Sequence, residues 1–143
     1  MKSIIQRHSI QTTRDTELIN LTALFREAVA NSGVQSGLAL IMTMHTTTAI
    51  TVNEGLPDLE DDLVTLLKHL ATEGLPYRHA RFLHSDGQMA VNAPSHLRGA
   101  LLGMQALFPV EGGQPLMGQR QSIYLVELDG PLQREVIVQI LGE

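Results

Sequence analysis

The amino-acid sequence predicts an α+β fold, in which a largely antiparallel sheet or sandwich carries about three helices. Apolar and β-branched runs typical of strands follow one another through short turns, which favours antiparallel pairing. Other apolar segments have helical spacing. The sequence shows no βαβ alternation with the glycine fingerprint of a nucleotide-binding sheet. With no internal repeat in 143 residues, these elements are expected to form one domain, residues 1–143.

The first part of the chain is expected to hold one helix between strands. Residues 3–10 predict a strand, and residues 16–30 place their apolar side chains near one face of a helix. Gly33 then suits a left-handed helix cap. Residues 37–45 are apolar at nearly every position, as in a strand covered on both faces, and residues 46–53 continue as β-branched sequence.

The remainder predicts two helices and three strands. Leucines at helical spacing predict a helix over 58–72, and acidic residues crowd its first turns, where the helix dipole favours negative charge. Residues 75–93 form a long polar segment, a length that is more often functional than accidental. Pro94 suits the first position of a short helix. The other expected elements are that helix, over 94–102, and strands over 104–110, 121–128 and 135–141.

Composition excludes several classes of function. The chain lacks cysteine, which excludes disulfides, thiolate catalysis and cysteine-based zinc sites. Its net charge is −5 and no two Lys or Arg residues are adjacent, so nucleic-acid binding through a basic patch is not expected. No apolar run is long enough to span a membrane, and the first residues lack a signal-peptide core. A soluble, cytoplasmic protein is therefore expected.

The first polar cluster follows the apolar strand. His45 would be held by that strand at the edge of a cleft, and the hydroxyls of Thr46 and Thr47 come directly after it. Asn53 and Glu54 add an amide and a carboxylate near the same strand. These residues predict a catalytic or binding site, and the alternative is a strand edge whose polar side chains face solvent.

The second cluster contains two more histidines. His79 lies in the long polar segment, and Asn92, Ser95 and His96 surround the start of the short helix. With His45, the two imidazoles could bind a divalent metal such as zinc or magnesium, or act as acid and base. Alternatively, each is an ordinary surface histidine, because no tight metal-binding spacing is present. A further histidine of the long segment, at position 84, could join the site.

The third cluster lies near the C-terminus. Gly118 precedes a polar run that includes Arg120 and Gln121, and Arg134 follows the next turn. Either arginine could hold a phosphate or carboxylate through two hydrogen bonds. The alternative is a surface salt bridge with the acidic residues at 127 or 129.

These clusters, in this order, resemble the YjbQ-like family, whose members are often labelled secondary thiamine-phosphate synthases. The resemblance runs across the whole chain, although each motif is short. Two motifs depart from the family pattern, since Gln119-Arg120 replaces Thr-Trp and Leu132 replaces the arginine of Gly-Pro-Arg. The matching residues are His45-Thr46-Thr47-Thr48-Ala49, Asn53-Glu54, Asp62, Tyr77-x-His79, Pro94-Ser95-His96, Gly103, Pro109-Val110, Gly112 or Gly113, and Gly118-x-x-Gln121.

The resemblance implies a homotrimer with the histidine site near a subunit boundary, and a weak ability to make thiamine phosphate from a pyrimidine diphosphate and a thiazole phosphate. We therefore expect an enzyme acting on a small anionic or phosphorylated metabolite. The alternatives are a non-catalytic trimeric module that binds a metabolite or metal, and a structural subunit. The residues expected to act in catalysis are His45, Glu54, His79 and His96; those expected to bind substrate are Thr46, Thr47, Asn53, Asn92, Ser95, Arg120, Gln121 and Arg134.

Overall fold

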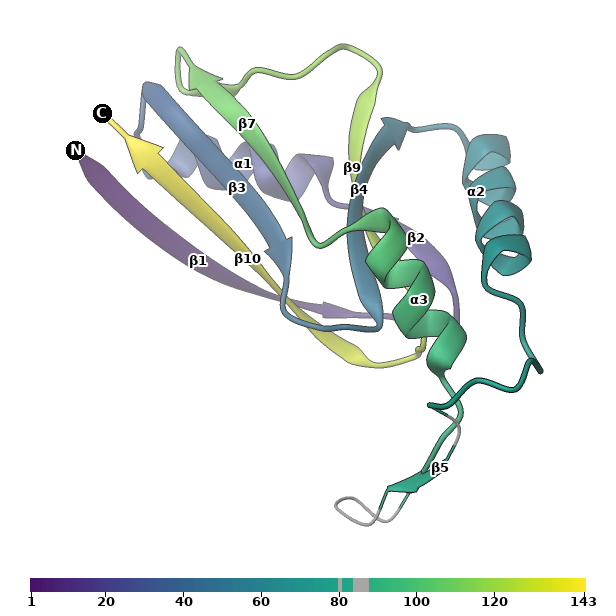
Figure 1. Ribbon diagram of the computed structural model, residues 1–143. Coiled ribbons are helices and arrows are strands. Elements are labelled where there is room, and N and C mark those ends of the chain that lie inside the picture. Colours follow the sequence, from purple (N-terminus) through teal and green to yellow (C-terminus); the bar gives the residue numbers. More distant parts are fainter. Residues whose placement is uncertain (80, 84–87) are drawn as a thin grey trace.

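The computed structural model describes residues 1–79, 81–83 and 88–143, with the backbone alone for 81–83 and 88–90. It confirms the α+β class, with antiparallel sheets and helices packed on them (Figure 1). The helices are α1 (Thr22–Ser32), α2 (Pro57–Leu70) and α3 (Ala93–Leu102). The strands are β1 (Lys2–Gln11), β2 (Glu17–Asn20), β3 (Ser36–Thr43), β4 (Thr48–Glu54), β5 (Arg81–Leu83), β6 (Gln88–Ala90), β7 (Gln105–Glu111), β8 (Gln114–Pro115), β9 (Gln121–Glu127) and β10 (Gln133–Gly142).

The strands form one large sheet, one small sheet and a separate hairpin. The large sheet has the order β1-β10-β3-β7-β8 and the small sheet has the order β2-β9-β4. All their neighbouring strands pair in antiparallel fashion, as do β5 and β6. The long polar segment thus carries the β5–β6 hairpin, and position 84 lies outside the described residues.

Hydrophobic side chains cover both faces of the small sheet, because its strands alternate between two clusters. Ile50 and Leu125 belong to the main core, which α1 and the inner face of the large sheet complete. Ala49 and Val126, one position away on each strand, pack with Leu67 of α2 in a second cluster. The small sheet therefore lies between the large sheet and the α2–α3 pair.

Helix α1 is shorter than the predicted helix over 16–30. Residues 17–20 form β2 instead, because they pair with β9, a partner more than a hundred positions away. Asn20 ends this strand, and its Oδ1 accepts a hydrogen bond from the Thr22 backbone N–H at 3.0 Å. At the other end Gly33 has a φ of 71°, which confirms the predicted left-handed cap.

Helices α2 and α3 are joined by a buried arginine that the sequence analysis did not single out. The Arg98 side chain is 2% exposed. Its Nε donates to the Leu67 carbonyl at 3.2 Å and its Nη2 to the Ala71 carbonyl at 2.7 Å. Glu73 lies 3.5 Å from Nη1. Arg98 therefore satisfies the last carbonyls of α2 and positions the loop that follows.

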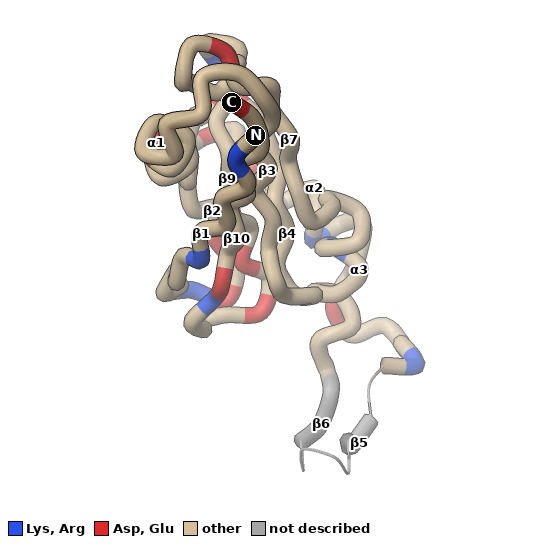
Figure 2. Tube along the Cα trace, turned by 90° about the vertical axis from the view of Figure 1, so that its left-hand side faces the viewer, with Lys and Arg blue, Asp and Glu red and all other residues tan. Residues whose placement is uncertain are grey.

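The outward face of the large sheet presents apolar side chains. Leu38 of β3 is 46% exposed and Leu107 of β7 is 58% exposed. Ile5 and Leu141 on the neighbouring strands are exposed as well. Charges of both signs are interspersed elsewhere along the trace (Figure 2). None of the helices within the described ranges is long and apolar enough to cross a membrane.

Candidate functional site

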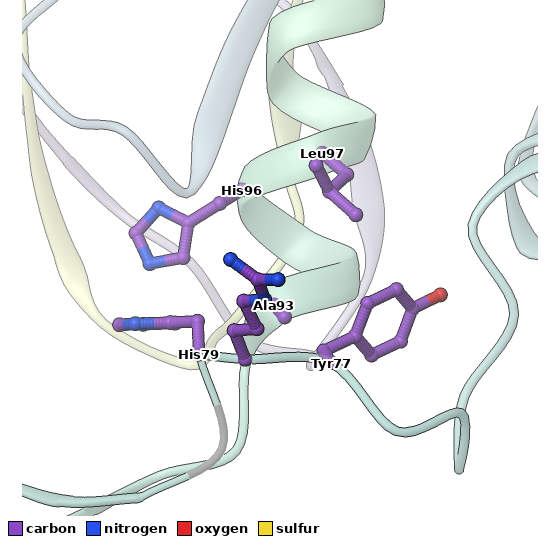
Figure 3. A pocket seen from close by; sticks show the side chains of 6 residues that line it. Tyr77, His79, Ala93, His96 and Leu97 are labelled. Atoms are coloured by element: carbon purple, nitrogen blue, oxygen red, sulfur yellow. The ribbon is translucent and has the colours of Figure 1, made fainter.

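Two of the three predicted histidines meet at the start of α3. The ring centroids of His79 and His96 are 5.0 Å apart, and the rings are nearly perpendicular (Figure 3). They line a pocket of about 340 Å³ with Arg78 and Tyr77. Tyr77 points away from the imidazoles in Figure 3, and its hydroxyl donates to the Thr72 carbonyl at 2.7 Å. The pocket thus combines two imidazoles and one guanidinium.

A chain of hydrogen bonds selects the tautomer of neutral His79. Asn92 Nδ2 donates to the Asp129 carboxylate at 2.8 Å, because that carboxylate can only accept. This turns Asn92 Oδ1 toward His79, whose Nε2 lies 3.2 Å away and must therefore carry the proton. In neutral His79 the free lone pair is consequently on Nδ1. Asn92 is the N-cap residue of α3, yet its side chain bridges these two groups instead of capping the helix.

His45 has the opposite tautomer. The backbone N–H of Glu135 donates to His45 Nε2 at 2.9 Å, so in the neutral imidazole the proton is on Nδ1. Burial lowers the pKa of His45 below its usual value, and the positive charge of Arg134 lowers it further. His45 is therefore a neutral imidazole that can donate from Nδ1.

His45 and His96 line a second pocket, of about 610 Å³, between the β3–β4 turn and α3. Thr46, the predicted substrate-binding hydroxyl, lines it as well. Because His96 lines both pockets, it forms the wall between them. The three histidines of the sequence analysis therefore lie along two adjoining pockets of one chain.

Arg134 and Thr47, which were predicted to bind substrate, belong to a buried hydrogen-bond network. Arg134 donates to both carboxylate oxygens of Glu127, at 2.8 and 2.6 Å, and to Thr47 Oγ1 at 2.9 Å. Burial alone would raise the pKa of Glu127, but the hydrogen bonds from Arg134 and Thr12 outweigh it and hold that pKa below its usual value. Glu127 is 0% exposed and Arg134 is 5% exposed, so most of the hydrogen-bonding capacity of this guanidinium is used inside the protein.

Ser95 is also structural. Its side chain is buried, and its hydroxyl donates to the Leu128 carbonyl at 2.6 Å. The contact ties the first turn of α3 to the end of β9. Ser95 therefore helps to position His96, the next residue of the helix.

The remaining predicted residues lie at the opposite end of the small sheet. Glu54 pairs with Gln121 in the β4–β9 register, whereas Thr48, at the histidine end, pairs with Glu127. Six strand positions separate these ends, a distance of about 20 Å. Glu54 forms a 3.5 Å ion pair with Arg120, which is 84% exposed. Gln121 Oε1 accepts from the Gly118 backbone, and Asn53 Oδ1 accepts from the Glu54 backbone.

The described residues of one chain bring two imidazoles together, but no third donor for a metal ion. No three His, Asp or Glu side chains of the described residues lie close enough to hold one. His45 is unsuited as a ligand, because its one lone pair in the neutral form accepts the Glu135 N–H. His79 and His96 are adjacent, but Glu54 lies at the other end of β4.

Three features of this region were missed from the sequence. Asp129 was considered as a salt-bridge partner of Arg120 or Arg134 and not of Asn92, and Arg78 was not singled out as a site residue. The methionines of the larger pocket, Met42, Met44 and Met104, come from two distant segments. The Asp129–Asn92 contact joins positions 37 residues apart, so no local pattern indicates it.

The fold and the site define an α+β protein in which imidazoles gather where α3 begins, beside the end of β9. The chain belongs to the YjbQ-like (UPF0047) family, because the family model for the UPF0047 protein YjbQ-like matches residues 6–143.

Curated relatives and solved structures agree with this assignment. A UPF0047 protein of Methanocaldococcus jannaschii is 33% identical over 138 residues, which cover 96% of this chain and 94% of that protein. UPF0047 protein YugU of Bacillus subtilis is 32% identical, with 93% and 96% covered. A crystal structure of a YbjQ-like protein of unknown function from Sulfolobus solfataricus matches with a TM-score of 0.90 at 36% identity, covering 99% of each chain. A hypothetical protein from Aeropyrum pernix matches with a TM-score of 0.87 at 33% identity, over the whole of both chains.

Proposed function

We propose that the protein is an enzyme that acts on a small anionic or phosphorylated metabolite, with His79 and His96 as its acid–base pair. The observation that carries the proposal is the packing of these two imidazoles 5.0 Å apart in a pocket that Arg78 also lines. Imidazole is the side chain best suited to exchange protons near neutral pH. A guanidinium beside it supplies the charge and paired donors that a phosphate or carboxylate needs.

His79 is the better candidate for the base. Its Nε2 proton is held by Asn92, so Nδ1 carries the lone pair that can accept a proton. Asn92 is in turn oriented by Asp129, so the ring is held in one tautomer before a ligand binds. His96 would then supply a proton to a leaving group or stabilise the charge that develops on it.

We extend the proposal to the reaction that the family resemblance implies. In that reaction the thiazole nitrogen attacks the methylene carbon of the pyrimidine diphosphate, a C–N bond forms, the C–O bond breaks and diphosphate leaves. Arg78 and a protonated imidazole would offset the charge of the departing diphosphate. Because Arg78 supplies the one guanidinium among the described lining residues, we expect that reaction to be slow and a side reaction.

We propose that a divalent metal such as zinc or magnesium, where one takes part, is held by His79 and His96, the two imidazoles that lie together among the described residues. We also propose a homotrimer formed through the outward face of the large sheet. Leu38 and Leu107 expose apolar area there that a second copy could bury. Sedimentation velocity tests the trimer: Leu107→Lys should give a folded monomer, and a trimer that persists would contradict this choice of face.

Variants at the histidines test the proposed function. His79→Ala and His96→Ala should each lower kcat/KM about a hundredfold or more on any phosphorylated substrate found by screening, or on the pyrimidine and thiazole pair. His69→Ala is the matched control, because His69 is an exposed histidine of α2 whose ring contacts the Thr65 carbonyl. Unchanged activity in both site variants would remove the proposal.

A non-catalytic binding module is the alternative outcome of the same experiment. In that case a ligand recovered from the purified protein by mass spectrometry would stay unconverted over long incubation. Elemental analysis of the same sample tests the metal: zinc or magnesium at one ion per chain that is lost in His96→Ala would support a metal held by the histidine pair, and a content unchanged in that variant would contradict it.

A further inference from the structure

The larger pocket, of about 610 Å³, differs in chemistry from the one beside Arg78. None of its eleven described lining residues carries a carboxylate, an ammonium or a guanidinium group. Three are methionines, from β3, the β3–β4 turn and the turn after α3: Met42, Met44 and Met104. Gly99, Ala100 and Gly103 form much of the α3 side, so the space is not filled by long side chains.

Several polar groups of this pocket are already bonded to the protein. Thr43 Oγ1 accepts the His45 backbone N–H at 3.2 Å and is paired with Thr48 Oγ1 at 2.5 Å. His45 Nε2 accepts the Glu135 backbone N–H. Within the described part of the chain, the polar groups left for a ligand are His45 Nδ1–H, the Thr46 hydroxyl and the His96 imidazole.

The pocket therefore suits an uncharged ligand group. His45 is held neutral, so it adds no positive charge to attract an anion. Methionine thioethers are polarisable and make favourable contacts with ring edges and faces. A volume of this size is in the range that holds a small organic molecule.

We propose that this pocket binds the flat, uncharged ring of a ligand whose anionic end lies at Arg78 and His79, with His96 between the two ends. The substrate class is therefore an amphipathic ring compound with a phosphate or carboxylate on a short arm. The ring site is argued independently, but the position of the anionic end rests on the proposed function.

Methionine methyl signals test the ring site directly. The chain has six methionines, of which three line the pocket, while Met1 and Met117 lie away from it. In a protein labelled with ¹³C-methyl methionine, benzyl phosphate should shift the signals of Met42, Met44 and Met104. Benzyl alcohol should shift the same signals at higher concentration. Inorganic phosphate should leave them in place and shift the imidazole signals of His79 and His96.

A pair of variants on α3 provides the control. Ala100 lines the pocket and is exposed, so Ala100→Trp fills the site without disturbing the core. It should weaken benzyl phosphate binding about tenfold, because the ring loses its apolar contacts. Leu101→Trp makes a similar change at the next residue, which is 63% exposed and outside the lining of both pockets, and should leave the affinity unchanged.

The outcomes separate this inference from the proposed function. If both ring probes leave the three methyl signals unmoved while phosphate still shifts the histidine signals, the ring site is wrong and the anion site stands. If the ring probes shift the three methyl signals but inorganic phosphate leaves the His79 and His96 signals unmoved, and benzyl phosphate binds no more tightly than benzyl alcohol, the proposed function fails and the ring site stands. Methyl signals that change with protein concentration alone would show that a second copy covers the pocket, which overturns the inference.

Discussion

Each end of the β4–β9 strand pair has a Glu–Arg ion pair, but one pair is buried and the other is exposed to solvent. At the histidine end Glu127 is fully buried and receives hydrogen bonds from Arg134 and Thr12. At the far end Glu54 meets Arg120 at 3.5 Å, and that arginine is largely exposed. The first end is a preorganised scaffold that holds the imidazoles in place, whereas the second is a solvated pair whose charges are available to another molecule. The comparison teaches that a Glu–Arg pair says little about a site until its burial is known.

Identical substitutions at the two ends should produce the largest difference. Glu127→Gln leaves the Arg134 charge buried without its partner, and should lower the free energy of unfolding by about 3–5 kcal/mol. Glu54→Gln should change it by less than about 0.5 kcal/mol, because the pair is exposed. Urea unfolding monitored by circular dichroism measures both. Equal effects would show that the contrast in burial has no energetic consequence.

Two arginines, Arg98 and Arg120, provide a second comparison between a buried and an exposed side chain. Arg98→Met removes donors from the buried Leu67 and Ala71 carbonyls, so we expect a loss of about 2–3 kcal/mol. Arg120→Met should be nearly neutral, since its guanidinium faces water. Amide hydrogen exchange at the C-terminal end of α2 should increase in the first variant alone, and protection that stays the same in both would exclude the proposed link between α2 and α3.

Substitution of Tyr124, in the middle of β9, should lower the free energy of unfolding by an intermediate amount. Its hydroxyl donates to Glu60 at 2.7 Å, and burial together with this bond raises the pKa of Tyr124 to about 12. Tyr124→Phe should cost about 1 kcal/mol. Because the unfolded tyrosine loses its proton near pH 10, stability should fall above pH 10 in the parent protein and less in the variant. Phenolate absorbance is readily resolved, as the chain has no tryptophan, and a component near pH 12 that survives in the variant would contradict the assignment.

The smallest expected effect is the contribution of His45 to the dependence of stability on pH below 7. The folded pKa of His45 lies below 6.5, so the unfolded chain binds an additional proton as the pH falls below that value. This contribution to stability is present above pH 6.5 and is lost below it. His45→Gln should flatten the dependence of the urea midpoint on pH between 7.5 and 5.5, and His69→Gln should not.

The fold could be predicted because its signals are local. Alternation over 3–10 and the leucine spacing after Asp58 each determine one element without reference to the rest of the chain. The start of α1 could not be predicted in this way, because residues 17–20 become a strand only through pairing with β9. Local patterns therefore predicted which elements exist better than where they begin.

The spatial grouping of the candidate residues was predicted in part. His79, His96 and Asn92 do lie together, as their motifs suggested. His45 and Glu54, nine positions apart in the sequence, were expected to act together, but the rise of β4 separates the strand ends by about 20 Å. Proximity along an extended strand is thus a poor guide to a shared site, whereas a loop and the helix that follows it can bring their histidines into contact.

The central claim is that the histidines are held in defined, opposite tautomers by their neighbours. Long-range ¹H–¹⁵N correlation spectra of ¹⁵N-histidine-labelled protein report this directly at pH 7.5. The account predicts a proton on Nδ1 of His45 and a proton on Nε2 of His79, with the His79 preference lost in Asp129→Ala. A proton on Nε2 of His45, or a His79 tautomer that is unaffected by removing the Asp129 carboxylate, would contradict it.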